Sequence, residues 1–414
     1  MKVGLEYSFN DVRLDAASHS TQRQLSVDLT AIAEAEDKDL PLNLCLVLDR
    51  SGSMAGKSLT TVQEAALGII KKLKVGDRIS VVAFDHRAKV IVPNQKVRDL
   101  AQIEHQIGMM IADGGTSINE GMRLGIKEVA IGRKNAVSRI FLLTDGENEH
   151  GDNRRCLKLA QLASEYNITI DTLGFGPHWN QDVLEQISDA AGGTLAYIEH
   201  PQAALQEFEK LLSRALSTGL TNTRLTVELM PKVRLAELKP VAQVAPETIE
   251  LPVRLEGNYF TLRLGDLMKN RSRRVLVNLY INQLPPGRHK IAAIQVCYDN
   301  PAKAQENLPS EIVAIEVESQ ERYQPLIDKS VQKSILTLAK YRQTQIAESK
   351  LESGDLNGAA TMLQTAAKTA LQLGDTNGST ILQTQATRLQ QKQQLSQSDR
   401  KKTRLISKTT IDAP

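Results

Sequence analysis

The sequence predicts a protein of the α/β class in which a doubly wound domain is inserted in an antiparallel β-sandwich and followed by a helical segment. Three observations lead to this prediction. Short apolar strands alternate with amphipathic helices over residues 40–217, which is the pattern of a parallel sheet covered by helices. Residues 1–39 and 221–318 show strand patterns with period-two alternation and turn residues between them, as in sandwiches. From residue 324 onward the pattern is helical.

Length and composition describe an ordinary folded protein. A chain of 414 residues suggests two or three domains, and 41% hydrophobic with 24% charged residues excludes a largely disordered chain. The 51 basic and 48 acidic residues leave a net charge of +3, and only 4% of residues are aromatic. A chain so balanced has neither the charge nor the stacking side chains of a nucleic-acid binder.

The cysteines and the apolar stretches indicate a cytoplasmic protein. Cys45, Cys156 and Cys297 are too far apart in sequence for a CxxC pair or a disulfide framework. Cys45 lies within an apolar run, so we expect a small buried hydrophobe. No apolar signal segment follows Met1, and no stretch reaches the roughly 20 apolar residues of a membrane span.

The N-terminal strands belong to the predicted sandwich. Residues 24–32 alternate at period two, but the first 39 residues are too few for a core of their own. We therefore infer that they complete the sandwich of residues 221–318. The α/β domain is then an insertion, which folds tolerate where chain ends lie close together.

Within residues 40–217 the pattern predicts six strands and the helices between them. Residues 78–84 and 88–92 are strands only a few residues apart, so they form a hairpin whose second strand runs antiparallel at or near the edge. The other predicted strands are 42–48, 137–144, 167–174 and 194–199. The predicted helices are 58–74, 103–110, 118–130, 153–166, 181–191 and 202–216.

The pattern of residues 324–396 predicts a helical hairpin or a small helical bundle. Two Gly-Asp steps, at residues 354–355 and 374–375, divide the segment into about three antiparallel helices. The first turn resembles a tetratricopeptide hairpin, and a plain helical appendage is the alternative.

The sequence predicts a flexible basic tail over residues 397–414, because residues 400–404 are mostly Lys and Arg. A phosphate on a tail hydroxyl would cancel much of the local positive charge, which makes the tail a candidate switch. The candidate hydroxyls are Thr403, Ser407, Thr409 and Thr410. A solubilising end is the alternative.

Oxygen side chains gather where the strands of the α/β domain end. Asp49, Ser51 and Ser53 follow the first parallel strand, Thr116 precedes a helix, and Asp145 follows another buried strand. Open α/β sheets bind ligands at the carboxyl ends of their strands, so these loops meet at one edge. Five oxygen ligands without imidazole or thiolate favour Mg²⁺, with Mn²⁺ as the alternative, over Zn²⁺.

These residues carry a resemblance to a known family. Residues 40–217 resemble a von Willebrand factor type A (VWA) domain of the bacterial type, and the same five side chains match every position of its metal-ion-dependent adhesion site (MIDAS). The resemblance implies a Rossmann-like fold and a Mg²⁺ ion that completes its octahedron with an acidic residue of a partner protein. Residues outside this range carry no equally specific motif.

Enzymatic interpretations fit the sequence less well. A phosphohydrolase with Asp49 as nucleophile usually needs a second acid two residues on, where Ser51 stands. A serine nucleophile needs a placed base, and the histidines are isolated in sequence. The chain has no GxxxxGK[ST] motif for ATP hydrolysis. Asp85, after a strand, lines the rim of the metal face or caps a loop.

The sequence therefore predicts a non-enzymatic, Mg²⁺-dependent protein-interaction module, or scaffold, that binds an acidic residue of its partner. The alternative is an adaptor subunit of a separate AAA+ ATPase, as in chelatase-like machines. A serine/threonine kinase system is the further partner that a phosphorylated tail implies. Nucleic acid and membrane spans are not expected.

Overall fold

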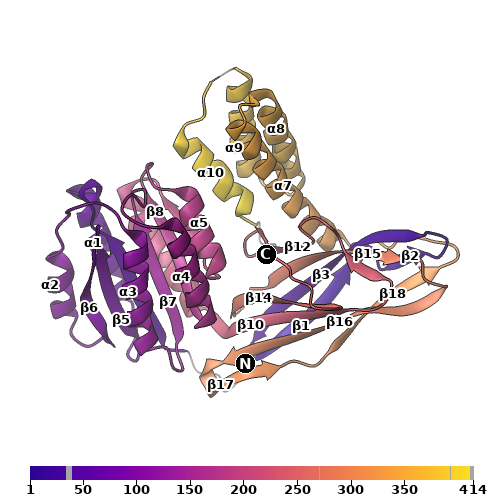
Figure 1. Ribbon diagram of the computed structural model, residues 1–414, viewed down its shortest axis with the longest axis horizontal. Coiled ribbons are helices and arrows are strands. Elements are labelled where there is room, and N and C mark those ends of the chain that lie inside the picture. Colours follow the sequence, from indigo (N-terminus) through magenta and orange to yellow (C-terminus); the bar gives the residue numbers. More distant parts are fainter. Residues whose placement is uncertain (34–39, 270, 392, 411–414) are drawn as a thin grey trace.

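The computed structural model describes residues 1–33, 40–269, 271–391 and 393–410. Figure 1 shows the α/β domain at one end, the β-sandwich at the other, and a helical domain above their junction. The predicted fold class, an α/β domain inserted in a sandwich and followed by helices, is confirmed. The predicted boundary at residue 39 falls among residues 34–39, which lie outside the described residues.

The sheet of the α/β domain has six strands in the order β6-β5-β4-β7-β8-β9. They are β4 (Leu42–Asp49), β5 (Arg78–Phe84), β6 (Ala88–Lys96), β7 (Val137–Thr144), β8 (Ile168–Phe175) and β9 (Leu195–Ile198). Neighbours run parallel except β5 and β6, so the predicted antiparallel edge hairpin is confirmed. Every residue of β4, β7 and β8 is buried, because helices cover both faces of the sheet.

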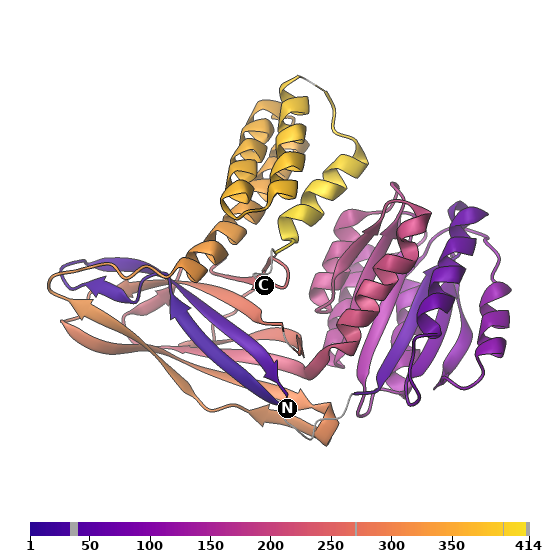
Figure 2. The same cartoon turned by 180° about the vertical axis from the view of Figure 1, so that it is seen from behind.

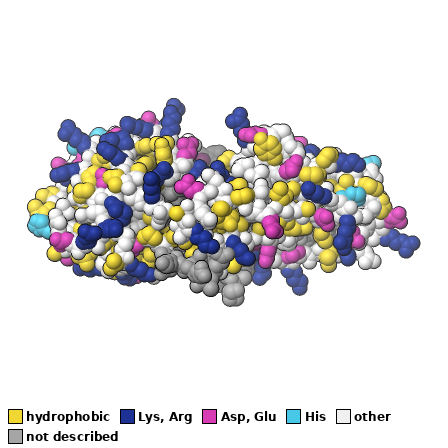
Figure 3. Space-filling model, turned by 90° about the horizontal axis from the view of Figure 1, so that it is seen from below, with side chains coloured by type: hydrophobic (Ala, Val, Ile, Leu, Met, Phe, Trp, Pro, Cys, Tyr) yellow, Lys and Arg dark blue, Asp and Glu magenta, His cyan; other side chains and the backbone are white. Residues whose placement is uncertain are grey.

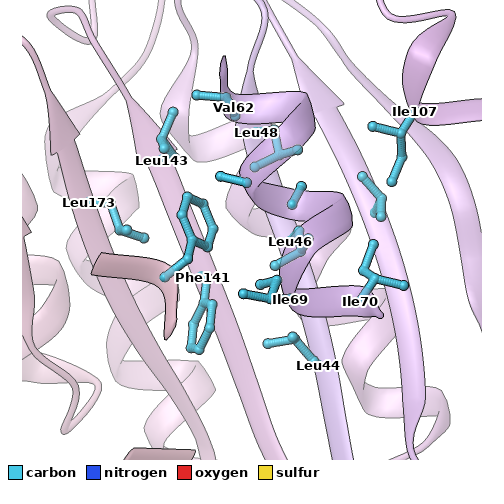
Figure 4. Close-up of a cluster of buried hydrophobic side chains, with 14 of the residues drawn as sticks. Leu44, Leu46, Leu48, Val62, Ile69, Ile70, Ile107, Phe141, Leu143 and Leu173 are labelled. Carbon is cyan, nitrogen blue, oxygen red and sulfur yellow. The ribbon is translucent and has the colours of Figure 1, made fainter. Parts of the chain in front are cut away.

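Alternate residues of the strands supply two separate cores. Leu44, Leu46 and Leu48 pack with α1 (Lys57–Ile70), α2 (Leu100–Gly108) and α6 (Ala204–Leu216), as Figure 4 shows for part of this cluster. Cys45 and Val47 point to the other face, where they pack with α3 (Ile118–Ile131), α4 (Asn153–Glu165) and α5 (Gln181–Ala190). The period of two in a strand explains this division, and Cys45 is the buried hydrophobe that its apolar run predicts.

The sandwich is assembled from strands on both sides of the inserted domain. One sheet has the order β1-β3-β15-β12-β13 with β11 also on β15, and the other has the order β14-β10-β16-β18-β2 with β17 on β16. The N-terminal strands are β1 (Lys2–Phe9), β2 (Arg13–Asp15) and β3 (Ser20–Ile32). The later strands are β10 (Thr218–Leu229), β11 (Val233–Leu235), β12 (Val241–Ala245), β13 (Ile249–Glu250), β14 (Tyr259–Met268), β15 (Arg273–Asn282), β16 (Gly287–Asn300), β17 (Gln305–Pro309) and β18 (Val313–Gln320).

The N-terminal strands contribute to both sheets and to the core between them. β3 pairs antiparallel with β15, whereas β2 pairs with β18 in parallel. Leu25 and Val27 of β3 share one apolar core with Phe260 and Ile294 of the later strands. Residues separated by more than 200 positions therefore form a single hydrophobic unit.

The helical domain contains α7 (Lys329–Glu352), α8 (Leu356–Gln372), α9 (Thr376–Gln390) and α10 (Gln397–Lys408). The two Gly-Asp steps make the turns between the first three helices. Gly354 and Gly374 have φ of +81°, which glycine adopts without strain. The carboxylates of Asp355 and Asp375 accept hydrogen bonds from backbone N–H groups at 2.8 Å and thereby cap α8 and α9.

The prediction of a flexible basic tail is wrong for residues 397–410, and residues 411–414 lie outside the described residues. Ser396 and Asp399 form a capping box that starts α10. Its basic residues meet acidic residues of α5, about 220 positions earlier, which a local pattern cannot reveal. The side chains of Thr403 and Ser407 are buried, so the folded chain does not offer these two hydroxyls to a kinase.

Charges of both signs are mixed on the face of the molecule drawn in Figure 3, where Lys and Arg side chains are interspersed with Asp and Glu side chains. Across the part of the chain that the structure describes, no helix is long and apolar enough to cross a membrane.

A buried guanidinium joins the α/β domain to the sandwich. Arg139 of β7 is 2% exposed. Its Nη1 lies 3.1 Å from Oδ2 of Asp171 on β8, and its Nη2 lies 3.0 Å from Oδ2 of Asp266 on β14. Thr169 also donates to Asp266 at 3.3 Å. One cation thus pairs with a carboxylate from each domain.

We predict that Arg139→Met lowers the free energy of unfolding by about 3–5 kcal/mol, because it removes the ion-pair partner of the buried carboxylates of Asp171 and Asp266. Urea denaturation measures the change. Arg123→Met is the matched control: this arginine pairs with Glu120 at the surface, so its loss costs less than about 1 kcal/mol. Equal effects of the two substitutions would contradict the prediction.

Candidate metal site

The structure brings all five predicted site residues to the carboxyl edge of the parallel sheet. Asp49 is the last residue of β4, and Ser51 and Ser53 lie in the turn that leads through a 3-10 helix (Gly52–Met54) toward α1. Thr116 lies in the loop before α3, and Asp145 directly follows β7. Parallel strands place these turns at one edge, which is why loops almost 100 residues apart converge.

The side chains of Ser51, Ser53 and Asp145 form a chain of hydrogen-bonding contacts, and Thr116 faces the same space. Ser51 Oγ is 3.0 Å from Ser53 Oγ, and Ser53 Oγ donates to Asp145 Oδ1 at 2.7 Å. A Cβ placed on Gly146 would lie 3.4 Å from Thr116 Oγ1 and 3.9 Å from Ser53 Oγ, so the threonine hydroxyl faces the same space. Asp49 sits below them, where it accepts from Ser51 N at 2.7 Å and from the hydroxyl of Thr144.

Backbone hydrogen bonds tie the three loops together. Gly52 N donates to Gly114 O at 2.9 Å, and Asp113 N donates to Arg50 O at 2.8 Å. His150 N donates to Thr116 O at 2.9 Å, which joins the third loop to the second. A cation that demands regular octahedral geometry needs ligands held in this way.

The electrostatics of the two aspartates favour a cation. Asp49 is fully buried, and burial raises its pKa to about 6, although hydrogen bonds from Thr144 and Ser51 oppose the rise. Burial also raises the pKa of Asp145, while Ser53 and the charge of His178 lower it. Two carboxylates and three hydroxyls without nitrogen or sulfur fit a small hard cation such as Mg²⁺.

Asp85 takes the loop-capping role rather than the rim. It is 1% exposed, accepts from Arg87 N at 2.7 Å, and forms an ion pair with Arg50. Its own carbonyl accepts from Ser117 N at 2.8 Å. Asp85 therefore holds the loop of Arg50 and the loop of Ser117 together.

Three histidines that are isolated in sequence surround this edge. A Cβ on Gly114 would clash with the ring of His86, and a Cβ on Gly115 would clash with the ring of His150, so a side chain at either position would displace a histidine. His178 lies near enough to Asp145 to act on its charge. Each histidine follows a strand of the parallel sheet (β5, β7 or β8), and that shared position was the signal available in the sequence.

Comparison with known proteins decides the family. Residues 43–211 match the von Willebrand factor type A domain, and residues 329–413 match the Sll0103-like, C-terminal alpha-helical domain. The chain is 57% identical to the uncharacterized protein sll0103 of Synechocystis over 100% of its own length and 99% of that relative. The chain belongs to the Sll0103-like family of VWA proteins.

More distant relatives share the VWA fold of this Sll0103-like protein. The uncharacterized protein YfbK of Escherichia coli is 25% identical over 62% of this chain and 45% of its own length. A solved von Willebrand factor type A protein from Catenulispora acidiphila has a TM-score of 0.82 at 19% identity and covers 99% of this chain and 97% of its own. The ArnB paralog VWA2 from Sulfolobus acidocaldarius has a TM-score of 0.59 at 13% identity, with 98% of both chains covered. The three-part architecture therefore occurs in distant sequences.

We predict that Asp49→Asn stabilises the metal-free protein by about 1–3 kcal/mol at pH 8. At this pH Asp49 of the wild type is ionised in the folded and in the unfolded state, and burial in the folded state disfavours the charged form. The amide still accepts from Ser51 N. Urea unfolding in EDTA measures the gain. Asp152→Asn, at the N-cap of α4, is the control and should leave stability nearly unchanged because Asn caps equally well. If Asp49→Asn lowered the free energy of unfolding instead, the folded protein would not disfavour the ionised carboxylate of Asp49.

Proposed function

We propose that this protein is a non-enzymatic interaction module that binds Mg²⁺ at a MIDAS and, through the ion, an acidic residue of a partner protein. The residues that would hold the ion are Asp49, Ser51, Ser53, Thr116 and Asp145. The observation that carries the proposal is the convergence of three hydroxyls and two carboxylates at one edge of the sheet. Mn²⁺ would suit the same oxygen ligands.

The balance of charges at the site favours binding of an external carboxylate. Three of the five side chains are neutral hydroxyls, and both oxygens of Asp49 already accept hydrogen bonds from Ser51 N and Thr144. A divalent ion touched mainly by neutral hydroxyls would therefore keep its attraction for the negative charge of an incoming carboxylate. Glu and Asp are the protein side chains that supply such a charge.

The same contacts argue against a phosphohydrolase. An aspartate nucleophile needs an unencumbered oxygen, whereas Asp49 is buried and hydrogen-bonded through both of its oxygens. Ser51 stands where the second acid would be required. A phosphatase assay with Mg²⁺ tests the enzymatic alternative directly.

A cytoplasmic location is part of the proposal. The three cysteines are free, and Cys45 and Cys156 are buried thiols whose pKa burial raises to about 12. Such thiols are unreactive, and a chain with free cysteines suits a reducing compartment.

We predict one Mg²⁺ or Mn²⁺ binding event in calorimetry of the wild-type protein and none in Asp145→Ala. The substituted protein should keep its fold, because Asp145 lies at the sheet edge and is partly exposed. Asp113→Ala is the matched control: this exposed acid lies on the same face but outside the five residues, so binding should persist. Binding that survives in Asp145→Ala would refute the assigned site.

We also predict that capture of partner proteins from native cells depends on the ion. Proteins retained by the wild type in Mg²⁺ should be lost both in EDTA and with Asp49→Ala. An AAA+ ATPase among the retained proteins would identify the adaptor role. Partners retained equally under all three conditions would show that recognition does not pass through the metal site.

A further inference from the structure

The last helix, α10, lies on the side of the helical domain that faces the VWA domain (Figures 1 and 2). Its cations meet acidic residues on α5 and after β9. Lys402 Nζ is 2.7 Å from Glu199, Arg404 Nε is 2.6 Å from Glu185, and Lys408 Nζ is 2.8 Å from both Glu185 and Asp189. Arg404 also pairs with Asp182.

The contact made by α10 differs chemically from the interior of the helical bundle. The side chains that α10 buries are all polar: Lys401, Thr403, Ser407 and Lys408. The core of α7–α9, in contrast, is built from alanine and leucine side chains such as Ala366 and Leu382. Salt and competing charges act on ion pairs but not on apolar packing. The pairs of Lys402 with Glu199 and of Arg404 with Asp182 are partly exposed, whereas the pair of Lys408 with Glu185 is buried and is screened less. A change of charge therefore acts on the contact of α10 with the VWA domain rather than on the core of the bundle.

One residue of α10 holds the loop that follows β8. Lys401 Nζ donates to Pro177 O at 2.5 Å and to Trp179 O at 2.8 Å, and it lies 4.1 Å from the centroid of the Trp179 ring. That ring packs so closely on Gly174 of β8 that a Cβ there would clash with it. The helix therefore fixes residues 177–180 against the carboxyl edge of the sheet.

The same loop touches the loop that carries Asp145. Asn180 Nδ2 donates to Glu147 Oε2 at 2.8 Å, and Glu147 is two residues beyond Asp145. Asn180 Oδ1 also accepts from Val183 N at 3.1 Å, which anchors the asparagine to the start of α5. Residues 177–180 thus contact α10 on one side and the candidate metal loop on the other.

We propose that α10 is an electrostatic latch that regulates the metal site. When α10 is docked, Lys401 holds residues 177–180, and Asn180 then holds Glu147 and with it the loop of Asp145. When the ion pairs open, that loop loosens and Mg²⁺ binds more weakly. An acidic protein surface that pairs with the cations of α10 in place of α5 would open the latch. The regulatory part rests on the metal site proposed above.

The test is Arg404→Glu in the full chain, which sets a negative charge against Asp182 and Glu185. Hydrogen–deuterium exchange should become faster in α10, in residues 177–180 and in residues 145–150, while β4 and β5 stay as in the wild type. The affinity for Mg²⁺ should fall by about fivefold or more, the usual size of such coupling.

Two variants serve as controls. Lys368→Glu makes the same change of charge at an exposed site on α8 and should leave exchange and affinity unchanged. Arg404→Lys keeps the cation and should resemble the wild type. If Arg404→Glu unfolds throughout, the wild type in rising NaCl supplies the comparison, with emission of Trp179, the single tryptophan, reporting the opening.

Exchange that rises in α10 and residues 177–180 but not in residues 145–150 would overturn the latch. No change anywhere would also overturn it, because the ion pairs would then not hold α10. A wild-type protein that binds no Mg²⁺ would refute the proposed function alone, since the exchange of residues 145–150 still decides whether the latch reaches that loop.

Discussion

The burial of the central parallel strands on both faces is the constraint on which the rest of the structure depends. Every residue of β4, β7 and β8 is enclosed, so side chains that bind or bear charge are restricted to strand ends unless a partner neutralises them. At the carboxyl ends this places Asp49 and Asp145 beside three hydroxyls. Arg139 of β7 and Asp171 of β8 are the exceptions within these strands; they pair with each other, and Arg139 also pairs with Asp266.

Two of the contacts between the VWA domain and the remainder of the chain differ in how far they are exposed to water. The contact of Arg139 with Asp266 is almost fully enclosed, so breaking it would leave unpaired charge in a low-dielectric interior. The contacts of α10 range from enclosed, at Lys408 and Glu185 with 5% exposed side chains, to open, at Asp182 with a 63% exposed side chain. The Arg139 contact with the sandwich is therefore enclosed throughout, whereas the contact with α10 has a partly exposed rim that a competing charge can reach.

The candidate site depends both on short sequence motifs and on contacts with residues that are not ligands. The oxygen ligands come from short motifs whose spacing is visible in the sequence, but their positions depend on Arg50, Asp85 and Thr144, which are not ligands. The glycines at 114 and 115 admit two histidines that come from other loops.

The sequence by itself determined the alternation of strands and helices, the edge hairpin, the two capped Gly-Asp turns and the five oxygen side chains, because each depends on near neighbours in the chain. Only the tertiary structure decided the role of α10. Its residues lack an apolar stripe, and the acids that hold Arg404 and Lys408 lie over 200 positions away. The same holds for the histidines around the metal edge and for the pairing of Arg139, since long-range contacts between charges leave no periodic pattern in a sequence.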